Sequence, residues 1–270
     1  MPTASIGDAQ LHYEVRGAGE PLLLVHGAVV ANAYEPLLDN SPLASNYQVI
    51  TYHRRGFGGS SGVDSPRSIA DEATDALDLL DHLGIGRAHI VGHSLAGLIV
   101  LQMAMQSPDR VATLGLFEPA YMAVPSGAAF GQAVAPIAEK FQSGDAAGAL
   151  GDFLLAVGGA DAMSRLELLT DEANRQALDD LETLFASDVA ALGGFQLSED
   201  AARSISQPVL TVLGTDSPSV FGEATELVRS WLPNVTAVSV EGSSHFLQME
   251  KPTEIGQQLL SFLAKHSATT

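Results

Sequence analysis

Strand-like and helix-like stretches alternate over the first 118 residues, and this alternation constrains the fold more than any other feature. Four short apolar runs have the pattern of buried strands: residues 21–27, 47–53, 88–93 and 111–118. Apolar residues at helical spacing fill 68–84 and 95–106, and residues 10–17 alternate like a half-exposed strand. Because strands connected by helices form a parallel sheet covered on both faces, we predict an α/β fold.

The alternation stops after residue 118 and resumes near residue 207. Three segments in between have helical patterns: 128–142, 146–159 and 171–192. Strand and helix patterns then return in four segments: 208–214, 222–233, 235–240 and 252–266. An all-helical block between two α/β stretches predicts a cap on a sheet. We therefore expect residues 1–118 and 207–270 to form one core, and residues 119–206 to form a helical cap.

Reactive side chains follow five of the predicted strands. The residues at these positions are His26, Ser94, Glu118, Asp216 and His245. Ligands of an open parallel sheet bind at the carboxyl ends of its strands. We therefore expect one serine, two candidate acids and a late histidine to share one rim of the sheet.

Ser94 lies at the boundary between a strand pattern and a helical pattern, in the stretch GHSLAG (92–97). A sharp strand–turn–helix needs small neighbours, and Gly92 and Ala96 supply them. The amide of Leu95 would then stand at a helix N-terminus, aimed where an oxyanion forms. The alternative is a packing turn with an incidental serine.

These residues resemble the G-x-S-x-G turn of the α/β-hydrolase family, with Ala96 where the family has its second Gly, and the resemblance extends over nearly the whole chain. The stretch YHRRGFGGSSG (52–62) is similar to the family's D-x-R-G-x-G-x-S segment, with His53 in place of Asp and structural roles for Arg54 and Arg55. The resemblance implies a mostly parallel central sheet, helices on both faces and a helical cap inserted after strand 6. It also implies a serine hydrolase that needs no cofactor and no metal, with Ser94 as nucleophile.

The same resemblance assigns the general base. Of the eight histidines, only His245 follows a late strand and precedes the final helix, where the family has its base. Gly242 before it, and Glu250 and Pro252 after it, fit the family pattern. His93 is expected to point its ring away from the nucleophile.

An oxyanion hole needs two backbone N–H donors. Leu95 supplies one by its position directly after the nucleophile. The second is expected from the loop after the strand that ends near Val25, with Ala28 preferred and Val29 as the alternative. His26 is expected to brace this loop through hydrogen bonds.

The acid that orients the imidazole has two candidates. The family most often places it after the strand that follows the cap, as G-x-x-D, but Asp216 is only two residues after Gly214, and Ser217 takes the third position. Glu118 ends the strand-like run before the cap, where haloalkane dehalogenases and zearalenone-type lactonases carry their acid. Those lactonases are also similar in having G-x-x-[ST]-P where the acid would otherwise lie. We therefore prefer Glu118 and keep Asp216 as the alternative.

Composition disfavours several classes of partner. The formal net charge is -19, from 32 acidic and 13 basic residues, which argues against nucleic acid and anionic membranes. The absence of Cys excludes a disulfide, a thiol nucleophile and a thiolate metal site. Neither a signal-peptide pattern nor an apolar run of membrane length is found, so we expect a cytoplasmic protein. The acidic residues are interpreted as a solubility shell, with adaptation to salt as the alternative.

Apolar residues of the cap and of the segment after His245 indicate the substrate. The residues expected to contact it are Tyr121, Met122, Phe153, Phe185 and Phe246. Other apolar cap residues that could serve either the substrate or the cap's own packing are Phe130, Leu154, Met163 and Phe195. Because the cap has few basic residues, we expect a small-to-medium hydrophobic ester or lactone, cleaved through an acyl-enzyme. A homodimer is an open alternative to a monomer.

Three other functions stay open from the sequence. A cofactor-free perhydrolase or haloperoxidase would use the same triad. A C–C bond hydrolase would also do so, although that group usually has a more Gly-rich oxyanion loop than HGAVVANAY (26–34). A ligand-binding receptor with little turnover belongs to a different class and would share only the fold.

Overall fold

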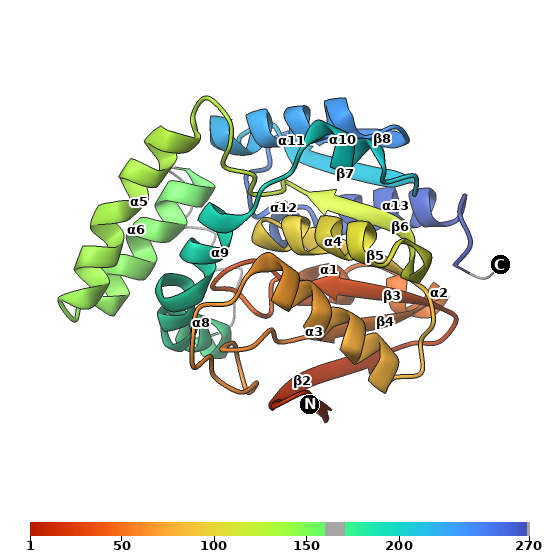
Figure 1. Cartoon of the computed structure of the whole chain (residues 1–270), viewed down its shortest axis with the longest axis horizontal. Coiled ribbons are helices and arrows are strands. Elements are labelled where there is room, and N and C mark those ends of the chain that lie inside the picture. Colours follow the sequence, from red (N-terminus) through yellow and green to blue (C-terminus); the bar gives the residue numbers. More distant parts are fainter. Residues whose placement is uncertain (160–170, 269–270) are drawn as a thin grey trace.

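The computed structural model of the protein describes residues 1–159 and 171–268. Its centre is an eight-stranded sheet in the order β1-β2-β4-β3-β5-β6-β7-β8 (Figure 1). The strands are β1 (Thr3–Ile6), β2 (Ala9–Arg16), β3 (Glu20–Val25), β4 (Tyr47–Tyr52), β5 (Ala88–His93), β6 (Val111–Phe117), β7 (Val209–Gly214) and β8 (Val235–Val240). β2 pairs antiparallel with β1 and β4, and all other pairs are parallel. The predicted, mostly parallel sheet is confirmed.

Helices cover both faces of the sheet, which is why its central strands are buried throughout. Every residue of β5 and β6 is buried, whereas β8 at the edge is half exposed. One face packs against α3 (Ile69–His82), α4 (Leu95–Gln106) and α11 (Ser219–Trp231). The other face packs against α1 (Glu35–Asp39), α2 (Leu43–Asn46), α12 (Leu247–Glu250) and α13 (Pro252–Leu263). A short 3-10 turn, η1 (Pro108–Arg110), precedes β6.

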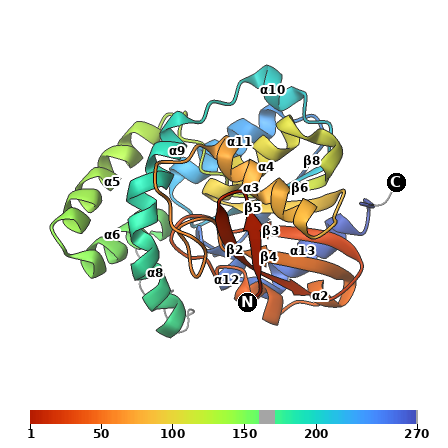
Figure 2. The ribbon, with the colours of Figure 1, turned by 60° about the horizontal axis from the view of Figure 1, so that its bottom comes forward.

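Most of the helices drawn between β6 and β7 gather beside one end of the sheet (Figures 1 and 2). We call four of them, with one π-helical turn, the inserted helices: α5 (Gly127–Gln142), α6 (Ala146–Gly158), α8 (Asp171–Thr183), the turn η3 (Leu184–Asp188) and α9 (Val189–Gly194). A third hydrophobic cluster joins them to residues that follow β3. The last helix of this stretch, α10 (Glu199–Arg203), contacts α11 and so lies on the helical layer of the sheet.

Short elements are where the structure differs from the sequence patterns. β1, α1, α2 and α12 have four or five residues each, too few for periodicity to show. The single helix predicted over 171–192 is instead two α-helices joined by η3. None of the helices in the described ranges combines the length and apolar character that a bilayer crossing requires.

Candidate active site

Among the residues that the structure describes, three that are not glycine have a left-handed backbone, and each follows the carboxyl end of a parallel strand. Val29 (φ 67°) follows β3, Ser94 (φ 57°) follows β5 and Glu118 (φ 48°) follows β6. Such strained conformations persist only where the surrounding structure enforces them, and they cluster at functional sites. Because β3, β5 and β6 are neighbours in the sheet, the three turns share one rim.

Ser94 stands on the sharp turn between β5 and α4. A Cβ atom at Gly92 would lie 2.2 Å from the carbonyl oxygen of Ala96, and one at Gly97 would lie 2.8 Å from Pro119. Glycine at these two positions therefore lets strand, helix and the following loop approach closely. Ala96 itself is fully buried, so the turn accommodates its methyl group where the family pattern has a glycine.

The structure brings Glu118 to His245. Nδ1 of His245 lies 2.6 Å from Oε2 of Glu118, and both side chains are buried. The other carboxylate oxygen, Oε1, accepts hydrogen bonds from the amide of Gly214 at 2.7 Å and the hydroxyl of Ser217 at 2.6 Å. An ionised carboxylate only accepts, so Nδ1 carries the imidazole proton and Nε2 is left as an acceptor.

Asp216 lies away from the imidazole. Its side chain is exposed and accepts a hydrogen bond of 3.1 Å from the hydroxyl of Thr215. The neighbouring Ser217, at the position where the family pattern would have an acid, donates to Glu118 instead. Of the two candidate acids, the structure therefore places only Glu118 against His245.

Aromatic and polar contacts hold the ring of His245. It stacks on Phe221 of α11, with ring centroids 3.6 Å apart and planes at 16°. Glu250 of α12 accepts hydrogen bonds from the amide and hydroxyl of Ser244, which fixes the loop before the ring. The ring of His93 lies beside that of His245: its Nε2 is 2.7 Å from the carbonyl oxygen of His245, and the two ring centroids are 4.6 Å apart. Burial lowers the pKa of His93 well below its usual value, so this ring is a neutral donor.

The loop after β3 and the start of α4 carry the candidate oxyanion amides. Ala28 lines a cavity together with Ser94, and its carbonyl accepts a hydrogen bond of 2.8 Å from the amide of Val30, which closes a tight turn around Val29. The side chain of Val29 is fully buried in the third hydrophobic cluster. Leu95 is the first residue of α4, and the first amides of a helix have no partner within it.

A small cavity adjoins Ser94 and His245. Its volume is about 30 Å³, room for roughly two water molecules. The remaining lining is mostly apolar and consists of Gly27, Ala28, Val30, Ala33, His93, Phe153, Leu154, Val157, Phe246, Gln248 and Met249. Of the five residues expected to contact substrate, the structure brings Phe153 and Phe246 to this cavity, and α6 contributes Phe153.

The other three expected contacts lie apart from this lining, as far as the structure describes the chain. Tyr121 belongs to the core, where its hydroxyl donates to the carbonyl of Leu197 at 3.0 Å. Phe185 packs against Phe141, with ring centroids 5.2 Å apart. Met122 is half-buried against the third hydrophobic cluster. These three side chains have packing contacts in the structure, and their contact with substrate stays a prediction.

The further apolar cap residues divide in the same way. Leu154 lines the cavity. Phe130 packs edge-on against Phe221, and Phe195 packs in the core. Met163 lies outside the described residues.

Gln248 is a cavity residue that the sequence patterns did not single out. Its side chain is fully buried, and neither Oε1 nor Nε2 has a hydrogen-bond partner among the described residues. Buried amides normally have partners, so a polar group of a substrate could pair with this one. Its only signal in the sequence is its place three residues after His245.

The arrangement contains the parts needed for nucleophilic catalysis. A hydroxyl on a strained turn, an imidazole with a free acceptor nitrogen, a buried carboxylate and two backbone amides meet at one rim. In the described ranges, no group of three or more His, Asp or Glu side chains is placed to hold a metal ion.

The chain belongs to the α/β-hydrolase fold family, because the model of that family matches residues 20–252. It is therefore a hydrolase of this family, and the fold predicted from the sequence is confirmed.

Two relatives illustrate the similarity in sequence. A protein of Azorhizobium caulinodans, whose name of carbamate hydrolase RutD is provisional, is 41% identical over 115 residues. That match spans 42% of this chain and 43% of the relative, so less than half of its length. The (E)-2-((N-methylformamido)methylene)succinate hydrolase of Acinetobacter baylyi is 25% identical over 255 residues, 93% of each chain.

Two solved structures illustrate the similarity in fold. An esterase from Thermogutta terrifontis superimposes with a TM-score of 0.81 at 23% identity, over 97% of this chain and 96% of that one. The enol-lactonase from Burkholderia xenovorans LB400 gives a TM-score of 0.82 at 22% identity, over 97% of this chain and all of that one. At such identities the likeness is one of fold.

Proposed function

We propose that the protein hydrolyses a small-to-medium, neutral, apolar carboxylic ester or lactone through an acyl-enzyme. Ser94 is the nucleophile, His245 the general base and Glu118 the acid. One observation carries the proposal: the buried 2.6 Å contact between Glu118 and His245 lies on the rim that presents Ser94, beside a mostly apolar cavity.

The geometry supports a definite order of proton transfers. Because Nδ1 of His245 donates to Glu118, its Nε2 takes the proton as Oγ of Ser94 attacks the carbonyl carbon. The tetrahedral oxyanion accepts hydrogen bonds from the amides of Leu95 and Ala28. The C–O bond then breaks, and the alcohol leaves with the proton from His245. Water, deprotonated by the same imidazole, attacks the acyl-enzyme and releases the acid and Ser94.

The character of the cavity supports the substrate class. Phe153, Leu154 and Val157 of α6 close it on one side, and Phe246 and Met249 contribute further apolar surface. Among the described residues that line the cavity there is no Asp, Glu, Lys or Arg, so a neutral acyl group fits best. In this proposal residues 119–206 act as the cap, because α6 limits the space in front of the nucleophile.

The decisive experiment compares Ser94→Ala with Ser230→Ala, an exposed serine of α11. Ser94→Ala should lower kcat for p-nitrophenyl butyrate by at least about 10³-fold and abolish labelling by a fluorophosphonate, with an unchanged melting temperature. Ser230→Ala should leave both unchanged. Retained hydrolysis in Ser94→Ala would overturn the proposal.

The same assay separates the rival functions. A burst that stalls after one turnover would favour a receptor. Peroxide-dependent bromination with a short-chain acid that exceeds ester hydrolysis would favour a perhydrolase. Steady turnover of esters graded by chain length, without peroxide, is the result expected here.

A further inference from the structure

The carbonyl oxygen of Gly27 accepts two hydrogen bonds in the loop after β3. Nδ1 of His26 lies 2.7 Å from it, and Nη2 of Arg54 lies 3.1 Å from it. The backbone amide of Arg54 donates to Nε2 of His26 at 3.0 Å, so Nδ1 carries the ring proton and donates. Burial, together with the nearby Arg54 charge, holds the pKa of His26 well below its usual value. The bracing expected of His26 therefore acts on this carbonyl.

The direction of this carbonyl also sets the direction of the next amide. The described chain has no cis peptide bond, and in a trans peptide the C=O and the N–H of one plane point in opposite directions. The N–H of Ala28 therefore points away from His26 and Arg54. A Cβ atom at Gly27 would lie 3.0 Å from Cβ of Ser94, so this peptide runs directly beside the nucleophile.

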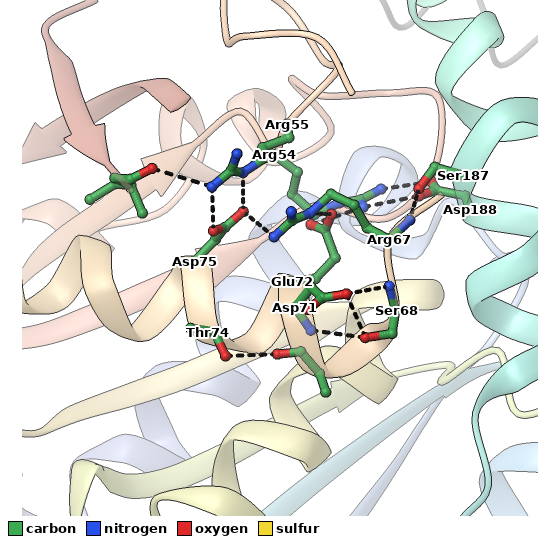
Figure 3. Close-up of polar contacts among 12 residues, drawn as sticks. Arg54, Arg55, Arg67, Ser68, Asp71, Glu72, Thr74, Asp75, Ser187 and Asp188 are labelled. Atoms are coloured by element: carbon green, nitrogen blue, oxygen red, sulfur yellow. Dashed lines mark hydrogen bonds and ion pairs between the residues drawn. The ribbon is translucent and has the colours of Figure 1, made fainter. Parts of the chain in front are cut away.

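Arg54 reaches from this loop to the inserted helices. Its Nη1 and Nη2 bind Oδ1 and Oδ2 of Asp188 in η3 at 3.1 and 2.7 Å, and Nη1 lies 3.3 Å from Glu72 of α3 (Figure 3). The guanidinium carbon lies 4.4 Å from the ring centre of Phe57. The side chain of Arg54 is fully buried. Such a two-pronged contact fixes both position and orientation of the planar guanidinium.

The charges around Arg54 are matched within the protein. Arg55 and Arg67 both pair with Asp75, and Arg67 also pairs with Glu72 (Figure 3). Three arginines thus face three buried carboxylates: Glu72, Asp75 and Asp188. Breaking one partner of such a network leaves a buried charge uncompensated. The cluster therefore holds its members in place, and Gly27 is the point where it meets the candidate site.

Building on the proposed function, we propose that Arg54 is a positioning residue of the oxyanion hole and that Asp188 places it. The docked inserted helices hold the guanidinium through Asp188, and the guanidinium holds the Gly27 carbonyl. The same peptide then presents the N–H of Ala28 to the oxyanion. A shift of η3 that displaces Asp188 weakens oxyanion binding while the nucleophile, base and acid stay in place, so the cap and the oxyanion hole act as one unit.

The test replaces Asp188 by Asn, which keeps the size and removes the charged acceptor. The expected result is a kcat for p-nitrophenyl butyrate about tenfold lower, because a misaimed donor loses part of the roughly 10²–10³-fold that a whole oxyanion donor supplies. KM should stay within twofold. An alkylboronic acid forms a tetrahedral adduct with the nucleophile, so its inhibition constant should rise by about the same factor as kcat falls. Arg54→Lys keeps a charge but cannot bridge both partners, and it should show the same pattern.

Two neighbours on the inserted helices provide matched controls. Thr183 donates to the carbonyl of Gly56 at 2.7 Å, and Ser187 accepts from the amide of Arg67 at 3.0 Å. Thr183→Val and Ser187→Ala each remove one hydrogen bond between the inserted helices and the segment after β4. Neither of these hydrogen bonds involves the side chain of Arg54. Both should leave kcat and boronate inhibition within twofold, even where the melting temperature falls.

Two outcomes would overturn the inference. In the first, Asp188→Asn and Arg54→Lys lower the melting temperature and leave kcat and boronate inhibition unchanged. In the second, the controls lower kcat as much as Asp188→Asn does, which would indicate general loosening. Failure of the proposed function is a separate result, because it would appear as ester hydrolysis retained in Ser94→Ala.

Discussion

The carboxyl edge of the sheet and the inserted helices meet at one cavity but are built differently. At the sheet edge, position depends on strained turns and short hydrogen bonds, such as the 2.6 Å contact between His245 and Glu118. On the other side, α6 contributes Phe153, Leu154 and Val157, which are held by packing. The difference teaches that reactive side chains are held at the strand ends by backbone geometry and hydrogen bonds, whereas the inserted helices supply apolar surface beside them.

A few polar contacts join the two regions at the loop after β4. Arg54 binds Asp188, and the amide of Gly58 donates to Asp180 of α8 at 2.9 Å. These links differ from the contacts within either region, because they involve buried charged groups and join elements that are far apart in the sequence. They connect the loop after β4 directly to η3 and α8.

The largest effect is expected at the acid. Glu118→Gln should lower kcat for p-nitrophenyl butyrate by about 10³-fold, because an amide no longer holds the imidazole in the tautomer that leaves Nε2 free. The exposed Asp216 offers the control, and Asp216→Asn should change kcat by less than twofold. Steady-state kinetics on both variants decide the matter. If only the Asp216 variant is damaged, the roles of the two acids must be exchanged.

The next effect concerns the turn that carries the nucleophile. Gly92→Ala would place a Cβ 2.2 Å from the carbonyl oxygen of Ala96, and we expect the free energy of unfolding to fall by about 3 kcal/mol. Gly86 has nothing within 4 Å of the corresponding Cβ position. Gly86→Ala should therefore change the free energy of unfolding by no more than about 0.5 kcal/mol. Urea denaturation measures both. An equal loss of unfolding free energy in the two variants would show that the turn at Gly92 is no more tightly constrained than the one at Gly86.

The same contrast explains which parts of the fold and of the candidate site could be predicted from the sequence. Buried strands and the small residues around Ser94 are visible locally, because hydrophobic pattern and steric crowding act over a few residues. The sequence left two candidates for the acid, Glu118 and Asp216, because Ser217 occupies the position where the family pattern has its acid. Apolar periodicity identifies a helix but not its neighbour, so Phe153 and Phe185 looked equivalent although only Phe153 lines the cavity. The link from Arg54 to Asp188 spans 134 residues, a distance that no local pattern covers.

The preference for acyl-chain length should depend on the inserted helices alone. Phe153→Ala removes a ring from a cavity of about 30 Å³, and the ratio of kcat/KM for an octanoate over an acetate nitrophenyl ester should rise about tenfold. Phe185→Ala removes an equal ring that packs on Phe141, so the ratio should stay constant while stability falls. A chain-length series on both variants measures this. An unchanged ratio in Phe153→Ala would place the acyl group elsewhere.

The smallest effect is a pH dependence at the junction of the two regions. Burial raises the pKa of Asp180 from 3.8 to about 6, and its Oδ2 has no partner among the described residues. Because the folded value exceeds the unfolded one, the stability that protonated Asp180 contributes is fully present below pH 3.8 and is lost as pH rises through 6. Asp180→Asn keeps an acceptor for the Gly58 amide and should be more stable than the wild type by about 1 kcal/mol at pH 7.5, a value reduced by partial solvent screening.

The advantage of Asp180→Asn should disappear near pH 4, and urea denaturation across this range measures it. Thr183→Val removes an uncharged link from the same helix, so its stability difference from the wild type should not vary with pH. A constant difference for Asp180→Asn would mean that the carboxylate is as well solvated in the folded protein as in the unfolded chain. The contact between Asp180 and the amide of Gly58 would then contribute the same stability at every pH in this range.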